Sequence, residues 1–331
     1  MKKTRILLLA MLMVFTLSGS ASTAAEKVEY KEYESGDFSY TLDQGGNAEI
    51  TGYRGDDRDL TVPSQVDGHP VTSIGEGAFL DRSGLTSVTL PEGLKSLGEY
   101  AFRGCSSLAS VSLPDSLVSM SDNPFAGFSD LAAVHLSPDH PVFAVTDGVL
   151  FNHADKILVA YTRAGKPQDY TVPPGIKSIG NGAFRECTGL ASVVLPEGLK
   201  SIGDNAFIAC IYLASVTLPE GLQSIGDDAF CDCVNLASVT LPEGLESLGD
   251  NAFNWCRKFT SLVVPEGVKY IGHFAFGSCP RLISVTLPAS LAAMGMDVFL
   301  DSYNTVLTVP RDSFALRYAQ DNGIPYEVIA K

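Results

Sequence analysis

The chain has 331 residues, with 38 acidic against 23 basic side chains and a formal net charge of −15. This balance excludes a nucleic-acid binder that works through clustered Lys and Arg, because such a protein must neutralise phosphates. Apolar residues make up 45% of the chain and charged residues only 18%, which excludes a disordered protein.

The first 25 residues have the three regions of a secretory signal peptide. Three basic residues precede the apolar run Ile6–Leu17, and small residues follow. The run is too short to span a bilayer as a helix, which needs about 20 residues. Ser20 stands where a lipoprotein signal would carry its lipidated Cys. We expect cleavage near Ala24–Ala25 and a chain that is secreted or loosely associated with the cell surface, with no membrane span or lipid anchor.

A unit of 23 residues then repeats along most of the chain. Residues 190–212 read LASVVLPEGLKSIGDNAFIACIY, and residues 213–235 read LASVTLPEGLQSIGDDAFCDCVN. Five cysteines keep the same interval: Cys187, Cys210, Cys233, Cys256 and Cys279. A period of this length lies within the range of leucine-rich repeats, about 20 to 29 residues.

Each unit predicts one short strand followed by turns. Apolar and small polar residues alternate over Leu213–Leu218, and Pro219 ends the strand. Asp227 is expected to cap a short helical turn through its carboxylate. One coil cannot bury its own apolar edge, so stacked coils must shield one another. We therefore predict a leucine-rich repeat solenoid, a curved stack of about eleven coils with one short parallel strand per coil.

The 23-residue repeat is interrupted near the middle of the chain. An Asp-Gly pair, Asp147–Gly148, lies between two apolar runs and predicts a β-hairpin, with a third strand over Ile157–Tyr161. The insertion could separate two repeat blocks or protrude from one. His140 and His153 lie here among three Asp residues, but without the compact spacing of a metal site.

The predicted organisation has six segments. They are a signal peptide (1–25), an N-terminal capping segment (26–59), a first repeat block (60–138), the β-hairpin insertion (139–168), a second repeat block (169–304) and a C-terminal cap (305–331).

The unit L-x-x-V-x-L-P-x-x-L-x-x-I-G-x-x-A-F-x-x-C-x-x resembles the BspA-like leucine-rich repeat family of bacterial secreted and cell-surface proteins. Residues 48–79 resemble the N-terminal module of that family, residues 147–151 (DGVLF) a recurrent insertion, and Ser313–Gly323 its closing helix. The resemblance extends from about residue 38 to residue 328. It implies adhesion to host matrix proteins or to other cells.

The Ala-Phe and Cys positions of the unit predict the core. We expect one internal aromatic column, made of Phe102, Phe125, Phe184, Phe207, Phe230, Phe253, Phe276 and Phe299. The repeated Cys position, which includes Cys105, suits a small buried hydrophobe. Neighbouring coils carry these side chains nearly parallel, unlike the geometry of a disulfide, so we predict seven free thiols. Cys231 lies off this row and is expected to be exposed.

The same register produces two acidic rows. One follows the strand (Glu92, Glu197, Glu220, Glu243 and Glu266), and the other precedes Ala-Phe (Glu99, Asp122, Asp204, Asp227 and Asp250). Like charges about 5 Å apart repel by only about 0.8 kcal/mol in water, so solvated rows are tolerated. Calcium bridging is an alternative, although a calcium site needs about six to eight oxygens. We predict no metal and no cofactor.

The sequence contains no recognisable catalytic motif. Its five His lie outside any metalloprotease or triad pattern, and its serines recur along a strand face. We therefore expect a non-enzymatic protein that binds an extracellular protein or glycan and no nucleic acid. The candidate binding residues are large apolar departures from the unit: Ile208, Tyr212, Trp255, Tyr270 and Phe274. Alternatives are chance drift at these positions, a secreted solenoid with unrecognised hydrolytic activity, and a structural spacer.

Overall fold

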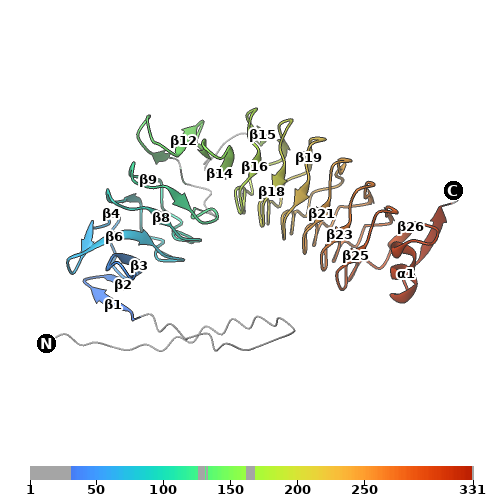
Figure 1. The fold of residues 1–331 in the computed structure, drawn as a ribbon, viewed down its shortest axis with the longest axis horizontal. Coiled ribbons are helices and arrows are strands. Elements are labelled where there is room, and N and C mark those ends of the chain that lie inside the picture. The colour runs from blue at the N-terminus through green and yellow to red at the C-terminus, as the bar shows by residue number, and fades with distance from the viewer. Residues whose placement is uncertain (1–30, 126–130, 132, 162–167, 330–331) are drawn as a thin grey trace.

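Each 23-residue unit forms one turn of a solenoid, and most units contribute two short strands rather than the one predicted. In the coil of residues 213–235 these are β19 (Ser215–Thr217), the predicted strand, and β20 (Ser224–Ile225). The computed structural model describes residues 31–125, 131, 133–161 and 168–329, so the predicted signal peptide lies outside it. About twelve such turns stack into a curved arc, one more than predicted (Figure 1).

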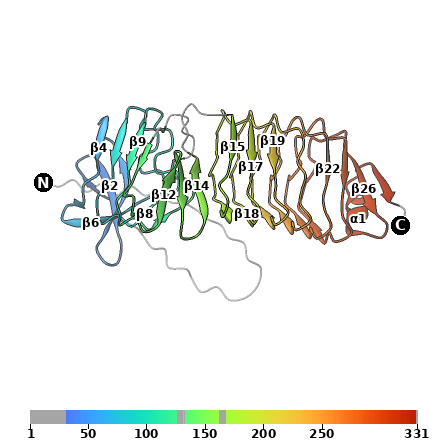
Figure 2. The ribbon, with the colours of Figure 1, turned by 90° about the horizontal axis from the view of Figure 1, so that it is seen from above.

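One strand from most coils joins an outer row, on the convex side of the arc (Figures 1 and 2). In the first block this row is β4 (Asp59–Thr61), β7 (Ser87–Thr89), β9 (Ser110–Ser112) and β11 (Ala133–His135). In the second block it is β15 (Asp169–Thr171), β17 (Ser192–Val194), β19, β22 (Ser261–Val263), β24 (Ser284–Thr286) and β26 (Val306–Pro310). The coil of residues 236–258 contributes no strand to it, so the row is interrupted between β19 and β22. Described pairs within the row are parallel and in register by the repeat, as Ser192 with Ser215 shows.

The second strand of each coil joins an inner row, toward the concave side (Figure 1). Its members in the first block are β6 (His69–Ile74), β8 (Ser96–Leu97) and β10 (Ser119–Met120). In the second block they are β16 (Ser178–Ile179), β18 (Ser201–Ile202), β20, β21 (Ser247–Leu248), β23 (Tyr270–Ile271) and β25 (Ala293–Met294). A strand of two residues is too short to show alternation in a sequence, which is why this row was not predicted.

Every described inner strand except β10, which Ser121 follows, is followed by a glycine at a tight bend. A Cβ on Gly226 would lie 2.8 Å from the backbone nitrogen of Asp204 in the preceding coil, closer than real Cβ atoms approach. Asp204, Asp227 and Asp250 each follow one of these glycines and link coils instead of capping their own turns, which corrects the prediction for Asp227. The Asp227 Oδ1 accepts a hydrogen bond from the backbone N–H of Asp250 at 2.7 Å, and Asp250 accepts one from His273 at 2.7 Å. Capping rules consider one turn alone and therefore miss this ladder between coils.

Both ends of the stack are covered. At the N-terminal end β1 (Tyr33–Ser35), β2 (Phe38–Leu42) and β3 (Ala48–Tyr53) form an antiparallel meander, β3 continues into the inner row through β6, and β5 (Gln65–Val66) pairs with β6. At the C-terminal end α1 (Phe314–Asp321) begins at Ser313, whose hydroxyl accepts from the N–H of Leu316. Ala315 and Ala319 of this helix are buried in the core, and β27 (Tyr326–Ile329) pairs with β26.

The buried aromatic side chains form two columns, not the single one predicted. One stacks Phe79, Phe102 and Phe125. The other runs from Phe184 to Phe299, with neighbouring ring centroids 4.7 to 6.0 Å apart. Tyr161 of the insertion, rather than Phe125, packs against Phe184, at 5.0 Å. The prediction failed at the point where the insertion interrupts the stack.

The insertion is a three-stranded sheet that lies between the two cores. β12 (Phe143–Thr146) and β13 (Val149–Asn152) form the predicted hairpin, and β14 (Ile157–Tyr161) pairs with both β13 and β16. Leu150 and Ala160 pack with the N-terminal core, whereas Val149 and Leu158 pack with the C-terminal core. Because the two faces of this sheet contact different cores, the insertion does not simply protrude from one block.

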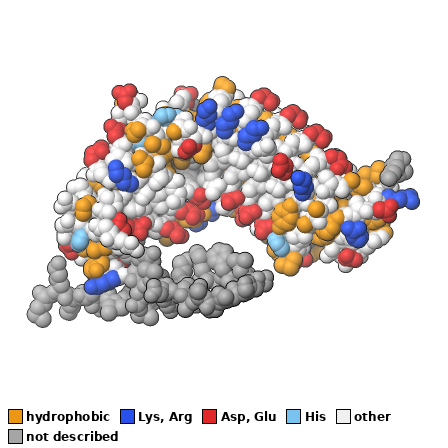
Figure 3. All heavy atoms as spheres, viewed as in Figure 1, with side chains coloured by type: hydrophobic (Ala, Val, Ile, Leu, Met, Phe, Trp, Pro, Cys, Tyr) orange, Lys and Arg blue, Asp and Glu red, His pale blue; other side chains and the backbone are white. Residues whose placement is uncertain are grey.

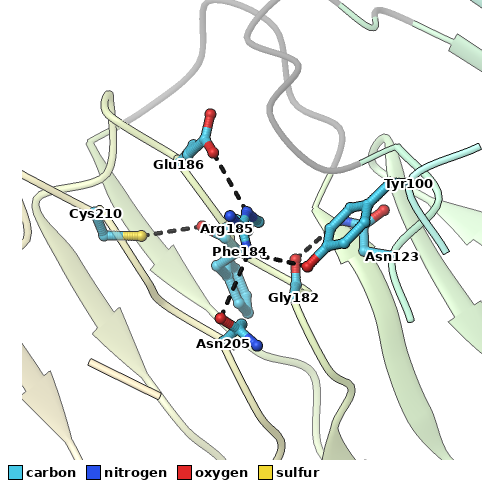
Figure 4. A network of polar contacts seen from close by, with 8 residues as sticks. All are labelled: Tyr100, Asn123, Gly182, Phe184, Arg185, Glu186, Asn205 and Cys210. Carbon is cyan, nitrogen blue, oxygen red and sulfur yellow. Dashed lines mark hydrogen bonds and ion pairs between the residues drawn. The ribbon is translucent and has the colours of Figure 1, made fainter. Parts of the chain in front are cut away.

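In the turns that follow the inner strands β10 and β16, the two blocks nevertheless touch directly. Asn181 donates a hydrogen bond to the Oδ1 of Asp122 at 2.8 Å, across 59 residues of chain. Figure 4 shows the neighbouring contacts, in which the Arg185 guanidinium reaches the Tyr100 ring of the first block, 5.3 Å from its centroid. Asn123 donates to the carbonyl of Gly182 at 3.1 Å. These contacts join coils that the insertion separates in sequence.

The cysteines are free, as predicted, but the repeated position has a polar role as well. The Cys210 thiol donates to the carbonyl of Phe184 in the preceding coil at 3.0 Å. Four other cysteines donate in the same way to the Phe of the coil before their own: Cys105, Cys233, Cys256 and Cys279. Two expectations need correction. Cys187 is only half-buried, because the insertion before it lacks an Ala-Phe turn, and Cys231 is half-buried rather than exposed.

Candidate binding surface

The five candidate binding residues do not form a single patch. Tyr212 is 60% exposed and lies just before the outer strand β19, whereas Tyr270 is on the inner strand β23. Ile208 is half-buried at the Ala-Phe turn of its own coil. Trp255 and Phe274 occupy the same kind of turn two and three coils further on. The structure therefore groups Trp255 with Phe274 and separates both from Tyr212.

Trp255 and Phe274 belong to a larger apolar group, which we call the C-terminal apolar corner: Trp255, Phe274, Met296 and Leu300. The backbone N–H of Phe274 bonds to the carbonyl of Met296 at 3.1 Å, and that of Trp255 bonds to Gly277 at 3.0 Å. Ser278, the next residue, bonds to the carbonyl of Leu300 at 2.6 Å. These bonds place the four residues on three adjacent coils. Figure 3 shows hydrophobic side chains gathered toward the C-terminal end of the face that it draws.

The two aromatic residues stand in a backbone conformation that disfavours them. Trp255 has φ +62° and Phe274 has φ +55°. Bulky side chains rarely adopt this left-handed region, which Asn, Asp and Gly tolerate. The same positions in neighbouring coils carry such tolerant or small residues: Asn205, Asp228, Asn251 and Asp297 for Phe274, and Ala209, Asp232, Ser278 and Asp301 for Trp255. The first block, however, carries Tyr100 at the position of Phe274 with φ +54°. Among the described coils, Trp255 is therefore the aromatic residue without an aromatic counterpart at its position.

Trp255 also has a cationic neighbour. Its side chain is 44% exposed, and the Arg257 guanidinium lies 4.8 Å from the ring centroid. This stacking fixes an aromatic face beside a positive charge at the surface. The corner thus offers an aromatic face, flexible apolar side chains and one cation to a partner.

The Asp ladder borders the corner on the inner side. Burial raises the pKa of the Tyr270 hydroxyl, and the carboxylates of Asp250 and Asp227 raise it further. Tyr270 therefore faces the acidic ladder and stays a neutral hydrogen-bond donor at physiological pH.

The sequence prediction did not include Met296 and Leu300, which are 68% and 48% exposed. The repeat register carries the signal that would have identified them. Met296 stands where the preceding coils carry His273 and Asp250, and Leu300 stands where an earlier coil carries Asn254. Following each surface position through the last coil would have added both residues to the candidate set.

The described residues hold no group of three or more His, Cys, Asp or Glu side chains placed to bind a metal ion. In the insertion, both ring nitrogens of His140 contact the protein itself. Its Nδ1 accepts from the N–H of Phe143 at 3.1 Å, and its Nε2 lies 3.1 Å from the carbonyl of Pro114. His140 thus ties the insertion to the first block.

A profile described as "BspA type Leucine rich repeat region" matches residues 60–149 and 177–306 in six copies. The solved structure of the pneumococcal vaccine antigen PcpA is similar, with a TM-score of 0.62 and 18% identity over 91% of this chain and 98% of that one. A leucine-rich cell surface protein of Faecalibacterium prausnitzii A2-165 also matches, with a TM-score of 0.44 and 19% identity over 89% of this chain and 97% of that one. The likeness to PcpA supports the fold.

No curated protein matches the chain. Across the residues that the structure describes, no helix has the length and apolar character needed to cross a membrane.

Proposed function

Because the chain belongs to the BspA-type leucine-rich repeat family, we propose that it is an exported, non-catalytic protein that binds an extracellular protein or glycan. The predicted signal peptide and the resemblance to secreted and surface proteins support export. A regular solenoid supports binding, since stacked coils present a broad, preformed surface. Adhesion to host matrix proteins or to other cells is the role that the family resemblance favours.

One observation supports our proposal that the binding site is the C-terminal apolar corner. Trp255 and Phe274 are bulky residues in the left-handed region, and at the position of Trp255 the neighbouring coils carry only Ala, Asp or Ser. Backbone strain of this kind tends to persist at functional sites. Exposed aromatic side chains also contribute a large share of interface energy. Selection for binding therefore accounts for residues that folding alone disfavours.

The test replaces each of the two aromatic residues by the residue that a neighbouring coil carries at the same position. Trp255→Ser and Phe274→Asn should leave the denaturation midpoint unchanged or higher, because they relieve the left-handed aromatic residues. The double variant should lose capture of whichever matrix protein or glycan the wild-type chain retains in a binding screen. Tyr212→Asn, which copies Asn235, removes an aromatic residue two coils away and serves as the matched control.

Full capture by the double variant would overturn the assignment to this corner. Cleavage of a captured protein or glycan, measured on the same samples, would instead favour the hydrolytic alternative. Failure of the wild-type chain to retain any ligand in the screen would favour the spacer.

A further inference from the structure

A second surface, at the junction of the two blocks, has a construction unlike the rest of the inner row. A groove of about 450 Å³ opens there, and Val118, Met120, Asp122, Asp155, Ile157 and Val159 are among its lining residues. We call it the junction groove. It lies away from the C-terminal apolar corner and is independent of the function proposed above.

The groove exists because the insertion adds strands to the inner side of the stack, whereas the turns that follow the inner strands join the two blocks directly. In the turns that follow β10 and β16, Asp122 contacts Asn181 directly. On the inner row, however, β14 pairs with β16 and continues into β13, while β10 pairs only with β8 among the described strands. An additional strand is thus accommodated on one side only, and β10 is left as a sheet edge beside the groove.

That edge presents backbone carbonyl groups to which another strand could donate hydrogen bonds. In every other described pair of neighbouring coils of the second block, two N–H groups donate to the preceding inner strand, as Lys200 does to Lys177 and Gly203 to Ile179. The corresponding acceptors of the β10 coil are the carbonyls of Val118 and Met120. No described residue donates a backbone hydrogen bond to either. An extended peptide could satisfy both by adding to the edge.

The side chains around the edge define the chemistry of that peptide. Val118 is 51% exposed, and Met120, Ile157 and Val159 are half-buried, so alternate apolar side chains would find contacts. Asp122 and Asp155 bring two carboxylates, and no described residue that lines the groove is Lys, Arg or His. This charge favours a cationic partner and disfavours an acidic one.

We propose that the junction groove binds an extended, cationic peptide segment of a partner protein as an added strand on β10. The backbone of that segment donates to the carbonyls of Val118 and Met120. Its Lys or Arg side chains approach Asp122 and Asp155, and its intervening apolar side chains lie against Ile157 and Val159.

The test uses the soluble chain and short probes in fluorescence anisotropy at low and high salt. The first probe is a labelled hexapeptide of alternating Lys and Val, the second its Glu-Val counterpart, and the third the Lys-Val peptide with alternate amides N-methylated. Neutral cello- and chito-oligosaccharides form the fourth arm. Val118→Lys combined with Asp155→Asn adds charge to the groove at exposed sites. Val194→Lys, at a 43% exposed valine of the outer row, is the matched control.

The Lys-Val peptide should bind the wild-type chain and the Val194→Lys control equally, and should bind the groove variant about tenfold more weakly. N-methylation should weaken binding about fivefold or more, because it removes donors to the edge. Trp255→Ser should have no effect. Equal binding to the groove variant, indifference to N-methylation, or no preference over the Glu-Val peptide would overturn the proposal. Binding of an oligosaccharide that the groove variant loses, with no peptide binding, would overturn it in favour of a glycan site.

Discussion

At the scale of single residues, the repeated Cys position shows what one side chain must do in this stack. It fills a small buried space and donates a hydrogen bond to the carbonyl of a Phe 26 residues earlier. In the last coil Ser302 takes the place of Cys and donates to Phe276 at 2.8 Å. A hydroxyl can therefore replace the thiol, which indicates that the donor is required and that sulfur chemistry is not.

The thiols should be slow to react in the folded protein. Burial raises the pKa of Cys105 and Cys279 to about 12 and that of Cys210, Cys233 and Cys256 above the ordinary thiol range. Because the thiolate is the reactive form, we expect thiol titration at pH 8 to find seven equivalents in denaturant and at most two in the native state. Burial raises the pKa of Cys187 and Cys231 to about 12 as well, but their side chains are only half-buried, so any thiols that react in the native state should be these two. A deficit of two equivalents in denaturant would reveal a disulfide.

The same shifts make stability fall at alkaline pH. Above the ordinary thiol pKa of 9.0, the unfolded chain releases protons that the folded chain keeps until about pH 12. The unfolded state therefore binds fewer protons, and the free energy of unfolding decreases as pH rises through this window. The buried Tyr53 hydroxyl, whose pKa burial raises to about 12, acts in the same direction. Urea midpoints at pH 8 and pH 10 should differ in this sense, and a higher midpoint at pH 10 would contradict it.

The Asp ladder gives a residue-scale test of contact between coils. Asp227→Ala removes the acceptor of the Asp250 N–H and should lower the free energy of unfolding by about 1 to 2 kcal/mol. Asp227→Asn keeps an acceptor oxygen, as Asn181 does for Asp204, and should cost less. Urea denaturation measures both, and Glu220→Ala in the exposed outer acidic row is the control. Equal losses for Ala and Asn would show that the charge, not the hydrogen bond, supports the stack.

At the scale of elements, the sequence predicts the features that have a recognisable residue pattern. The outer strands, the aromatic and Cys rows and the Asp147–Gly148 hairpin follow from alternation, register and turn chemistry. The inner strands do not, because two residues such as Ser224 and Ile225 carry no period. The two-column core was also missed, since nothing local to Phe125 or Phe184 reveals that a sheet will lie between them.

The aromatic columns make each coil depend on its neighbours. Phe230 is fully buried between Phe207 and Phe253, with ring centroids 5.0 and 5.2 Å away. Phe230→Ala should lower the free energy of unfolding by about 3 to 5 kcal/mol. Hydrogen exchange should also quicken in the adjacent coils, because stability in a solenoid lies in the interfaces. Tyr212→Ala, at an exposed aromatic residue, should change neither, and protection lost only within the coil of Phe230 would argue against coupling between neighbours.

At the scale of the molecule, the sequence predicts the arc but not the way its two halves join. Asp122 and Asn181 are far apart in sequence and become neighbours only because the insertion occupies one side of the stack. The junction groove arises from the same mismatch, so no motif marks it. The candidate binding residues were found as departures from the repeat, but their grouping required coordinates. Tyr212 and Trp255 are equally unusual in sequence, and only the backbone places Trp255 beside Phe274, Met296 and Leu300.

The central claim is that successive 23-residue coils stack in register into an elongated arc. Small-angle X-ray scattering of the chain that begins at residue 31 tests it most directly. The stacked arc predicts an asymmetric distribution of interatomic distances and a radius of gyration clearly above the value of about 20 Å expected for a compact protein of this length. A symmetric distribution with a radius of gyration near 20 Å would contradict the stack.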